Sequence, residues 1–173
     1  MAGTANRLED IVHGDIKPRN ILVFKDSTGA YIAKVIDFGY SSRFAHTGER
    51  ARMPTSIPWT APEQNNYAMP VSTAKKMDAY SFGMLCLWLL YFSSEQDSGD
   101  YANSQHSFFR ALQRQGPALT LATRLIEEET RLEGDASNSL AELFRLTLDH
   151  NPLRRISDFS KFLDLLDCWR RPG

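Results

Sequence analysis

Two acidic residues, an amide and a lysine lie near the start of this 173-residue chain, in types and spacing that could move a phosphoryl group. Residues 13–20 read His-Gly-Asp-Ile-Lys-Pro-Arg-Asn, and Asp37 follows a later apolar run. Phosphoryl transfer needs a carboxylate to orient the attacking hydroxyl, ligands for magnesium and a cation near the phosphate oxygens. Asp15 could be the carboxylate, Asn20 and Asp37 the metal ligands, and Lys17 the cation. The set predicts a phosphotransfer loop.

These residues resemble the catalytic and metal loops of eukaryotic protein kinases, whose signature is H-R-D-L-x-x-x-N, then D-F-G, then A-P-E. The second segment is Asp37-Phe38-Gly39 and the third is Ala61-Pro62-Glu63. Residues 78–83, Asp-Ala-Tyr-Ser-Phe-Gly, look like the start of the family's buried central helix, and residues 151–155, Asn-Pro-Leu-Arg-Arg, look like its D-P-x-x-R segment. One such triplet would be a weak signal, but the ordered set is specific.

The resemblance runs from about Ile11 to about Leu166 and corresponds to the family's C-terminal lobe. The residues before His13 are too few for a glycine-rich loop, a V-A-I-K-type lysine and its helix glutamate. We therefore expect the N-terminal lobe to be missing, with a helix stub over residues 5–9. The isolated chain is then expected to be inactive, unless a separate or upstream N-terminal lobe completes it.

The resemblance implies ATP and Mg²⁺ as cofactors and a protein as substrate. Asp15 would orient the substrate hydroxyl, Lys17 would reach the transferred phosphate, and Asn20 and Asp37 would hold the metal. Lys17 followed by Pro18 is similar to the Ser/Thr-specific members rather than the tyrosine-specific ones.

Other roles are likewise implied by the resemblance alone. Leu22 would lie beneath the adenine ring, and Ser56 would contact Asp15 and Lys17. Glu63 and Arg155 would form a buried ion pair, and Asp78 would accept hydrogen bonds from the catalytic-loop backbone. His13, Phe38 and Gly39 would complete the two loop motifs as structural residues.

Gly14 departs from the family pattern, because most members have an arginine there that receives the phosphate of the activation loop. Its loss suggests that activity is not switched through that contact. Phosphorylation of Thr47 or of its neighbours is thus a weaker hypothesis, although Ser41, Ser42 and Thr55 also carry hydroxyl groups.

Two alternatives stay open. His-Gly-Asp, Asn and Ile-Asp-Phe also resemble the aminoglycoside and choline phosphotransferases, which lack the Ala-Pro-Glu segment and the Asp-x-Tyr-Ser-Phe-Gly helix. The chain could also be a non-catalytic binding module that docks proteins through its helical half.

The fold class expected is α+β, mainly α-helical, with a small β-hairpin that carries the catalytic and metal loops. The hairpin is predicted from strand patterns over residues 20–24 and 31–36, separated by turn residues 26–29. Four segments organise the domain: catalytic and metal loops over 11–39, an activation segment over 40–63, a central buried helix over 75–92 and a helical subdomain over 108–169. Within the last we predict helices over 108–115, 119–132, 140–148 and 158–169, and we predict a solvated loop over 93–107.

Composition fits one globular domain, with 42% hydrophobic and 24% charged residues. The net charge of −1 gives no whole-chain case for nucleic acid or an anionic membrane as a partner. There is no signal-peptide pattern, and the longest apolar region, residues 77–92, falls short of the roughly 20 residues of a membrane span. We predict a cytoplasmic or nuclear protein.

Cys86 and Cys168 lack metal-ligand spacing and are expected to be packing residues.

Overall fold

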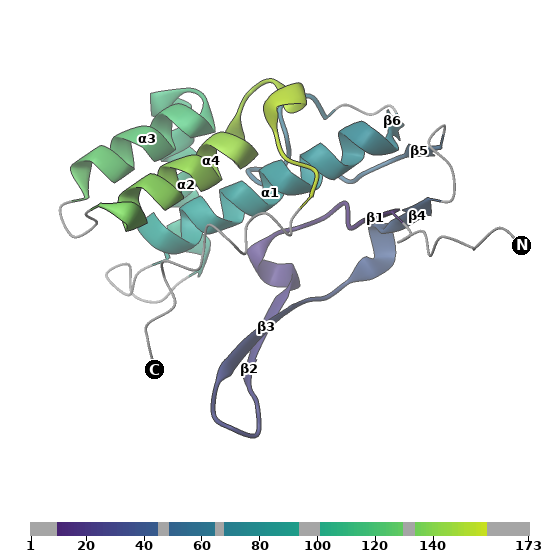
Figure 1. Cartoon of the computed structure of the whole chain (residues 1–173), viewed down its shortest axis with the longest axis horizontal. Helices are drawn as coiled ribbons and strands as arrows, with labels where there is room; N and C mark the ends of the chain where they lie inside the picture. The colour runs from purple at the N-terminus through teal and green to yellow at the C-terminus, as the bar shows by residue number, and fades with distance from the viewer. Residues whose placement is uncertain (1–9, 45–48, 65–67, 94–100, 130–133, 159–173) are drawn as a thin grey trace, which may run out of the picture.

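The computed structural model describes residues 10–44, 49–64, 68–93, 101–129 and 134–158 (Figure 1). Among them are four α-helices that pack together and a β-hairpin that projects from them, so the α+β, mainly helical fold class is confirmed. The helices are α1 (Val71–Tyr91), α2 (Tyr101–Gln115), α3 (Ala118–Glu128) and α4 (Asp135–Leu148). The strands are β1 (Asp10–Val12), β2 (Ile21–Lys25), β3 (Tyr31–Val35), β4 (Ser42–Phe44), β5 (Arg50–Ala51) and β6 (Met69–Pro70).

Helix α1 is the centre of the helical part. Residues 77–81 are all buried, and five successive residues point in every direction around a helix, so this part of α1 is enclosed on all sides, whereas Leu89 and Leu90 near its end are half exposed. Gly83 lets α4 approach, since a Cβ there would lie 2.7 Å from Thr147 Cβ and 2.8 Å from Leu148 Cδ2. The helix predicted over 75–92 is confirmed, although it begins one turn earlier, at Val71, and ends at Tyr91.

An aromatic cluster ties the segment before residue 64 to the helices. Trp59 is 2% exposed and packs edge-on against Trp88 of α1, with ring centroids 5.9 Å apart. Its ring also lies 5.7 Å from that of Phe108 on α2, which in turn lies 5.0 Å from Phe92. The loop that carries Trp59 is therefore anchored in the main core.

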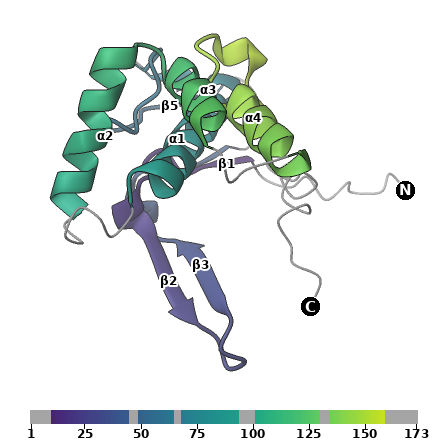
Figure 2. The same cartoon turned by 90° about the vertical axis from the view of Figure 1, so that its left-hand side faces the viewer.

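Strands β2 and β3 form the predicted hairpin, with Ile21 opposite Val35. Asp26 closes its turn, because its Oδ1 accepts the backbone N–H groups of Thr28 (2.8 Å) and Ala30 (3.0 Å). The hairpin extends away from the helices in both views (Figures 1 and 2).

Several of the helix and loop boundaries that we predicted from the sequence were wrong. Part of the loop predicted over 93–107 is helical, because α2 begins at Tyr101. Helix α3 ends at Glu128 rather than at 132, since acidic side chains disfavour a helix C-terminus. Helix α4 begins at Asp135 rather than at 140. Its first turn is polar, so no apolar pattern marked this start in the sequence. Residues 40–63, which we predicted to be a loop, contain the two short strands β4 and β5, which pair with β1 and β6.

Other predictions fall outside the described residues: the stub over 5–9, nearly all of the helix over 158–169, and Cys168. Cys86 is largely buried, which raises its thiol pKa to about 12 and fits a packing role. No helix among the described residues is long and apolar enough to cross a membrane.

Candidate phosphotransfer site

The loop after β1 is held in place by a carboxylate from α1. Asp78 accepts the backbone N–H of His13 at Oδ2 (2.6 Å) and that of Gly14 at Oδ1 (2.9 Å). Burial raises the pKa of Asp78, while these two N–H groups and the nearby His13 ring oppose the increase. The hydrogen bonds expected between Asp78 and the loop backbone are thus present, and they fix the loop to the most buried element of the fold.

His13 connects this loop to the segment that contains Asp37. Its Nδ1 accepts the N–H of Asp15 (3.2 Å), and its Nε2 lies 3.1 Å from the carbonyl oxygen of Ile36. These two contacts together require the proton on Nε2. The imidazole also meets Phe38 edge-on, with ring centroids 4.9 Å apart.

Ser41 adds a second connection, because its hydroxyl donates to the carbonyl oxygen of His13 (3.2 Å). This link was not predicted as a contact, since Ser41 attracted notice only as a hydroxyl. Gly14, the residue that follows His13, has φ 84°, a conformation that glycine adopts without strain.

Asp15 lies at the centre of a network of polar side chains and is only 5% exposed. Its Oδ2 pairs with Lys17 Nζ at 2.7 Å, and its Oδ1 accepts the Ser56 hydroxyl at 2.8 Å. Lys17 Nζ also donates to Ser56 Oγ at 3.2 Å, so the three groups form a closed triangle. Burial alone would raise the pKa of Asp15, but the hydrogen bonds from Lys17, Ser56 and Asn20 and the lysine charge together hold it below its ordinary value.

Asn20 and Asp37 occupy the same end of the hairpin. The N–H of Ile36 donates to the Asn20 carbonyl oxygen (2.9 Å), and Asp37 is the next residue along the chain. Asn20 is 5% exposed, and its amide nitrogen donates to the backbone oxygen (2.8 Å) and Oδ2 (3.2 Å) of Asp15. Asp37 is exposed and left-handed (φ 62°), and its Oδ1 accepts the N–H of Gly39 at 3.3 Å.

This donor set fits magnesium that is shared with a nucleotide. The Asn20 nitrogen is engaged by Asp15, whereas its amide oxygen receives no hydrogen bond from a described residue. No group of three or more His, Cys, Asp or Glu that could cage a metal occurs in the described part of the chain. Magnesium bound by one or two protein oxygens takes its remaining ligands from phosphates and water.

Three anchors of the segment leading to Glu63 were missed in the sequence. Thr60 Oγ1 accepts the N–H of Ser56 (2.7 Å), Ser81 Oγ donates to the Trp59 carbonyl oxygen (2.9 Å), and Gln64 Nε2 donates to the Met53 carbonyl oxygen (3.2 Å). Only Ser81 carried a signal, since it lies in the motif that begins at Asp78.

The predicted ion pair between Glu63 and Arg155 is present. The two Oε atoms of Glu63 lie 2.6 and 2.9 Å from the guanidinium nitrogens, and the arginine side chain is fully buried. The same guanidinium donates to the Asp149 carbonyl oxygen (2.6 Å) and lies over the Tyr80 ring (4.7 Å). The pair thus fastens the end of the segment at Glu63 to α1 and to the loop after α4.

The structure therefore gathers most of the site residues that the sequence suggested. Leu22, expected to contact adenine, lies outside this network and is 50% exposed on β2. Phe38 is 58% exposed despite its contact with His13.

The family model for the protein kinase domain matches this chain over residues 7–166. The chain belongs to the protein kinase family. Members of this family transfer a phosphoryl group from ATP to proteins, usually with a divalent metal.

Individual kinases show the same relationship. A probable leucine-rich repeat receptor-like protein kinase of Arabidopsis thaliana is 30% identical over 87% of this chain, and a probable serine/threonine-protein kinase of Dictyostelium discoideum is 28% identical over 86%. A PTI1-like tyrosine-protein kinase 2 of Arabidopsis thaliana is 37% identical over 46%. The matches cover 12%, 19% and 21% of those three proteins.

Proposed function

We propose that this kinase domain transfers the γ-phosphoryl group of ATP to serine or threonine hydroxyls of proteins. The observation that carries the proposal is the triangle of Asp15, Lys17 and Ser56, in which a hydroxyl already lies between a carboxylate and an ammonium group. These are the two partners that a reacting hydroxyl needs, one to take its proton and one to balance the charge of the phosphate.

Each residue then has a role in the transfer. The substrate hydroxyl oxygen forms a bond to the γ-phosphorus, the bond to the β-phosphate oxygen breaks, and Asp15 accepts the hydroxyl proton. The lowered pKa of Asp15 keeps it ionised at neutral pH, as this role requires. Lys17 lies beside Asp15 and would contact the transferred phosphate. Bound Mg²⁺, held by Asn20 and Asp37, would supply charge neutralisation at the nucleotide phosphates.

Specificity for serine and threonine rests on Lys17, Pro18 and the Ser56 contact, all of which resemble Ser/Thr-specific members. One relative is named a serine/threonine-protein kinase and another a tyrosine-protein kinase, so names alone do not decide the acceptor. The Glu63–Arg155 pair favours a protein kinase over the small-molecule phosphotransferases, since those families lack the Ala-Pro-Glu segment.

Nucleotide bound by the described residues alone would be held weakly, and turnover by this chain would be low or absent. Leu22, the residue proposed to contact adenine, is half exposed, and neighbouring apolar side chains on the same strands and loops are exposed as well. They are Val23 (58%), Val35 (40%), Ile36 (39%) and Tyr40 (54%). Because phosphoryl transfer depends almost wholly on positioning, a loosely held nucleotide reacts slowly. The same exposed surface keeps the non-catalytic binding module as the second candidate.

The proposal is tested by label transfer from γ-³²P-ATP with Mg²⁺ to two peptides that differ only in a serine or tyrosine acceptor. Wild-type chain and the variants Asp37→Asn and Asp15→Asn are compared after circular dichroism has shown that each is folded. We expect any label on serine only, and none with either variant. Label on tyrosine contradicts the specificity, and label that persists in Asp37→Asn contradicts the metal role. Folded wild-type chain that transfers nothing moves this chain to the binding-module alternative.

A further inference from the structure

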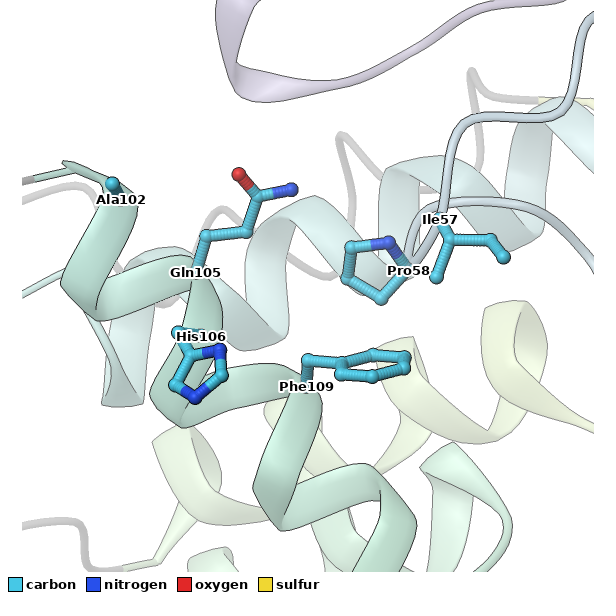
Figure 3. Close-up of a pocket in the computed structure, with 6 residues that line it drawn as sticks. All are labelled: Ile57, Pro58, Ala102, Gln105, His106 and Phe109. Atoms are coloured by element: carbon cyan, nitrogen blue, oxygen red, sulfur yellow. The ribbon is translucent and has the colours of Figure 1, made fainter.

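Two cavities lie beside the peptide unit Ile57–Pro58. The smaller, of about 300 Å³, lies between this unit and α2 (Figure 3). The larger, of about 350 Å³, extends from the same unit to residues of α1 and to the start of α3. Its volume is near the lower end of the roughly 300–1,000 Å³ of small-molecule sites. The larger cavity therefore suits a small ligand.

Apolar side chains from three parts of the chain form most of the wall of the larger cavity. They are Ile57, Pro58 and Pro62 of the segment before α1, Met84 of α1, and Phe109 and Leu112 of α2. Such a wall favours the alkyl or aromatic part of a ligand, because burial removes apolar surface from water. No described Asp or Glu lines the cavity, so its described wall carries no negative charge.

The start of α3 supplies backbone donors in the same cavity. Pro117 and Ala118 line it, and Ala118 is 4% exposed. No described residue accepts a hydrogen bond from the N–H groups of Ala118 and Leu119, and Pro117, at the N-cap, has no side-chain oxygen to offer. The next two N–H groups, of Thr120 and Leu121, donate to the Pro117 carbonyl oxygen (2.9 and 3.2 Å). The helix dipole adds partial positive charge here, which favours an anion.

Tyr80 of α1 is an independent sign of a ligand in this cavity. The residue lines the cavity and is 7% exposed, and no described residue shares a hydrogen bond with its hydroxyl. Burial raises the pKa of Tyr80 to about 12, so the hydroxyl keeps its proton and can donate. The Arg155 guanidinium over the Tyr80 ring is already paired with Glu63. Since a buried donor without a partner is costly, this hydroxyl indicates an acceptor inside the cavity.

We propose that the larger cavity binds a small carboxylic acid with an apolar body. The carboxylate accepts the N–H groups of Ala118 and Leu119 and the hydroxyl of Tyr80, because an ionised carboxylate has acceptors only. The apolar body lies against Met84 and Leu112. Inorganic phosphate would leave this apolar wall unfilled, so an organic acid is the better match.

A bound acid would also contact the segment that leads from the phosphotransfer site. Pro58 and Pro62 belong both to the wall of the cavity and to the stretch between Ser56 and Glu63. The ligand would therefore brace this stretch. The proposal does not depend on phosphoryl transfer, since Asp15 and the metal ligands take no part in it.

The test is a titration of the whole ¹⁵N-labelled chain with octanoate, followed by ¹H–¹⁵N NMR. We expect saturable shifts of the Ala118 and Leu119 amide signals, with a dissociation constant of about 1 mM or below. Octanoate should bind at least about tenfold more tightly than acetate, because about six additional methylene groups leave water. It should bind about three- to tenfold more tightly than octanamide, because hydrogen bonds to a charged acceptor are stronger.

Two variants and one control locate the site. Pro117→Asp puts a carboxylate at the N-cap of α3, where it accepts the Leu119 N–H group itself; the thermal midpoint should stay equal or rise, while octanoate affinity falls at least about tenfold. Tyr80→Phe keeps the ring and should weaken binding about three- to tenfold. Asn138→Asp adds the same charge in the first turns of α4, outside the cavity lining, and should change the affinity by no more than about twofold.

Several results would overturn the proposal. They are an absence of saturable shifts at Ala118 and Leu119, equal affinities for octanoate and octanamide, and unchanged octanoate binding in Pro117→Asp. A peptide acid, acetyl-Ser-Gly-Leu-Leu, is titrated in parallel. Tighter binding of this peptide than of octanoate would assign the cavity to the C-terminus of a protein and would also overturn the proposal of a small acid.

Discussion

Removing Arg155 is the most informative perturbation of the fold that supports the site. Its side chain is fully buried, bonds both carboxylate oxygens of Glu63, and donates to the carbonyl oxygens of Asp149 (2.6 Å), Lys76 (3.3 Å) and His150 (3.3 Å). Arg155→Ala leaves the Glu63 carboxylate, whose side chain is 17% exposed, without its counter-charge. Breaking a buried pair on one side costs about 3–5 kcal/mol.

That loss is a large share of the roughly 5–15 kcal/mol that stabilises a typical domain. Urea unfolding followed by circular dichroism measures it, and the thermal midpoint should fall by about 6–20 °C for a chain of this size. Arg155→Lys should lose less, because it keeps the charge but not the paired nitrogens, and it gives a measurable value if the alanine variant does not fold.

The neighbouring arginine is a matched control. Arg154 is 72% exposed and lies 3.9 Å from Asp149, so Arg154→Ala should change the free energy of unfolding by no more than about 0.5 kcal/mol. A loss below about 1 kcal/mol in Arg155→Ala, or equal losses in the two alanine variants, would refute the reasoning that the buried pair fastens the segment ending at Glu63.

Three further substitutions test other parts of the account. Asp78→Asn replaces one accepting oxygen with an amide nitrogen that faces a backbone N–H, and should cost about 1–3 kcal/mol in urea unfolding. A loss near zero would deny its role in holding the loop after β1. Gly83→Ala should cost about 1–3 kcal/mol by overpacking against Thr147, in spite of the better helix propensity of alanine, and a gain in stability would show that α4 can move away. Burial raises the pKa of Asp15, but its hydrogen bonds and the charge of Lys17 outweigh that effect and hold the pKa below 3.8. The stability that this carboxylate contributes is therefore present above pH 3.8 and is lost as the pH falls through the pKa of Asp15 in the folded chain. Asp15→Asn should therefore lose less stability on acidification, as judged from urea midpoints at several pH values, and an unchanged acid dependence would argue against this network.

Much of the site could be predicted from the sequence because its residues lie in short ordered segments. The hairpin from Ile21 to Val35 has strand patterns and a turn built by Asp26, both of which are local signals. The contacts of Asp78 with the loop after β1 and of Glu63 with Arg155 span long sequence separations and were reached through the family resemblance. Neither follows from periodicity.

The features that were missed share a physical cause. The first turns of α2 are polar, and Ser104 is buried there without giving an apolar repeat, so the segment read as loop. The anchors Thr60 and Gln64 act by hydrogen bonds between side chains and backbone, which leave no hydrophobic pattern. Both cavities beside Ile57 depend on how α2 packs against a distant loop, and this tertiary arrangement has no local signature.

The central claim is that Asp37 and Asn20 hold a metal bound to nucleotide phosphates, and magnesium-dependent ATP binding tests it most directly. Isothermal titration with and without Mg²⁺ would compare the wild-type chain with Asp37→Asn and with the control Asp26→Asn, whose amide oxygen can still accept the turn hydrogen bonds. We predict weak binding that requires Mg²⁺, falls at least about tenfold in Asp37→Asn, as expected for loss of a charged ligand, and is unchanged in Asp26→Asn. Binding that is independent of Mg²⁺, or equally strong in Asp37→Asn, would contradict the account.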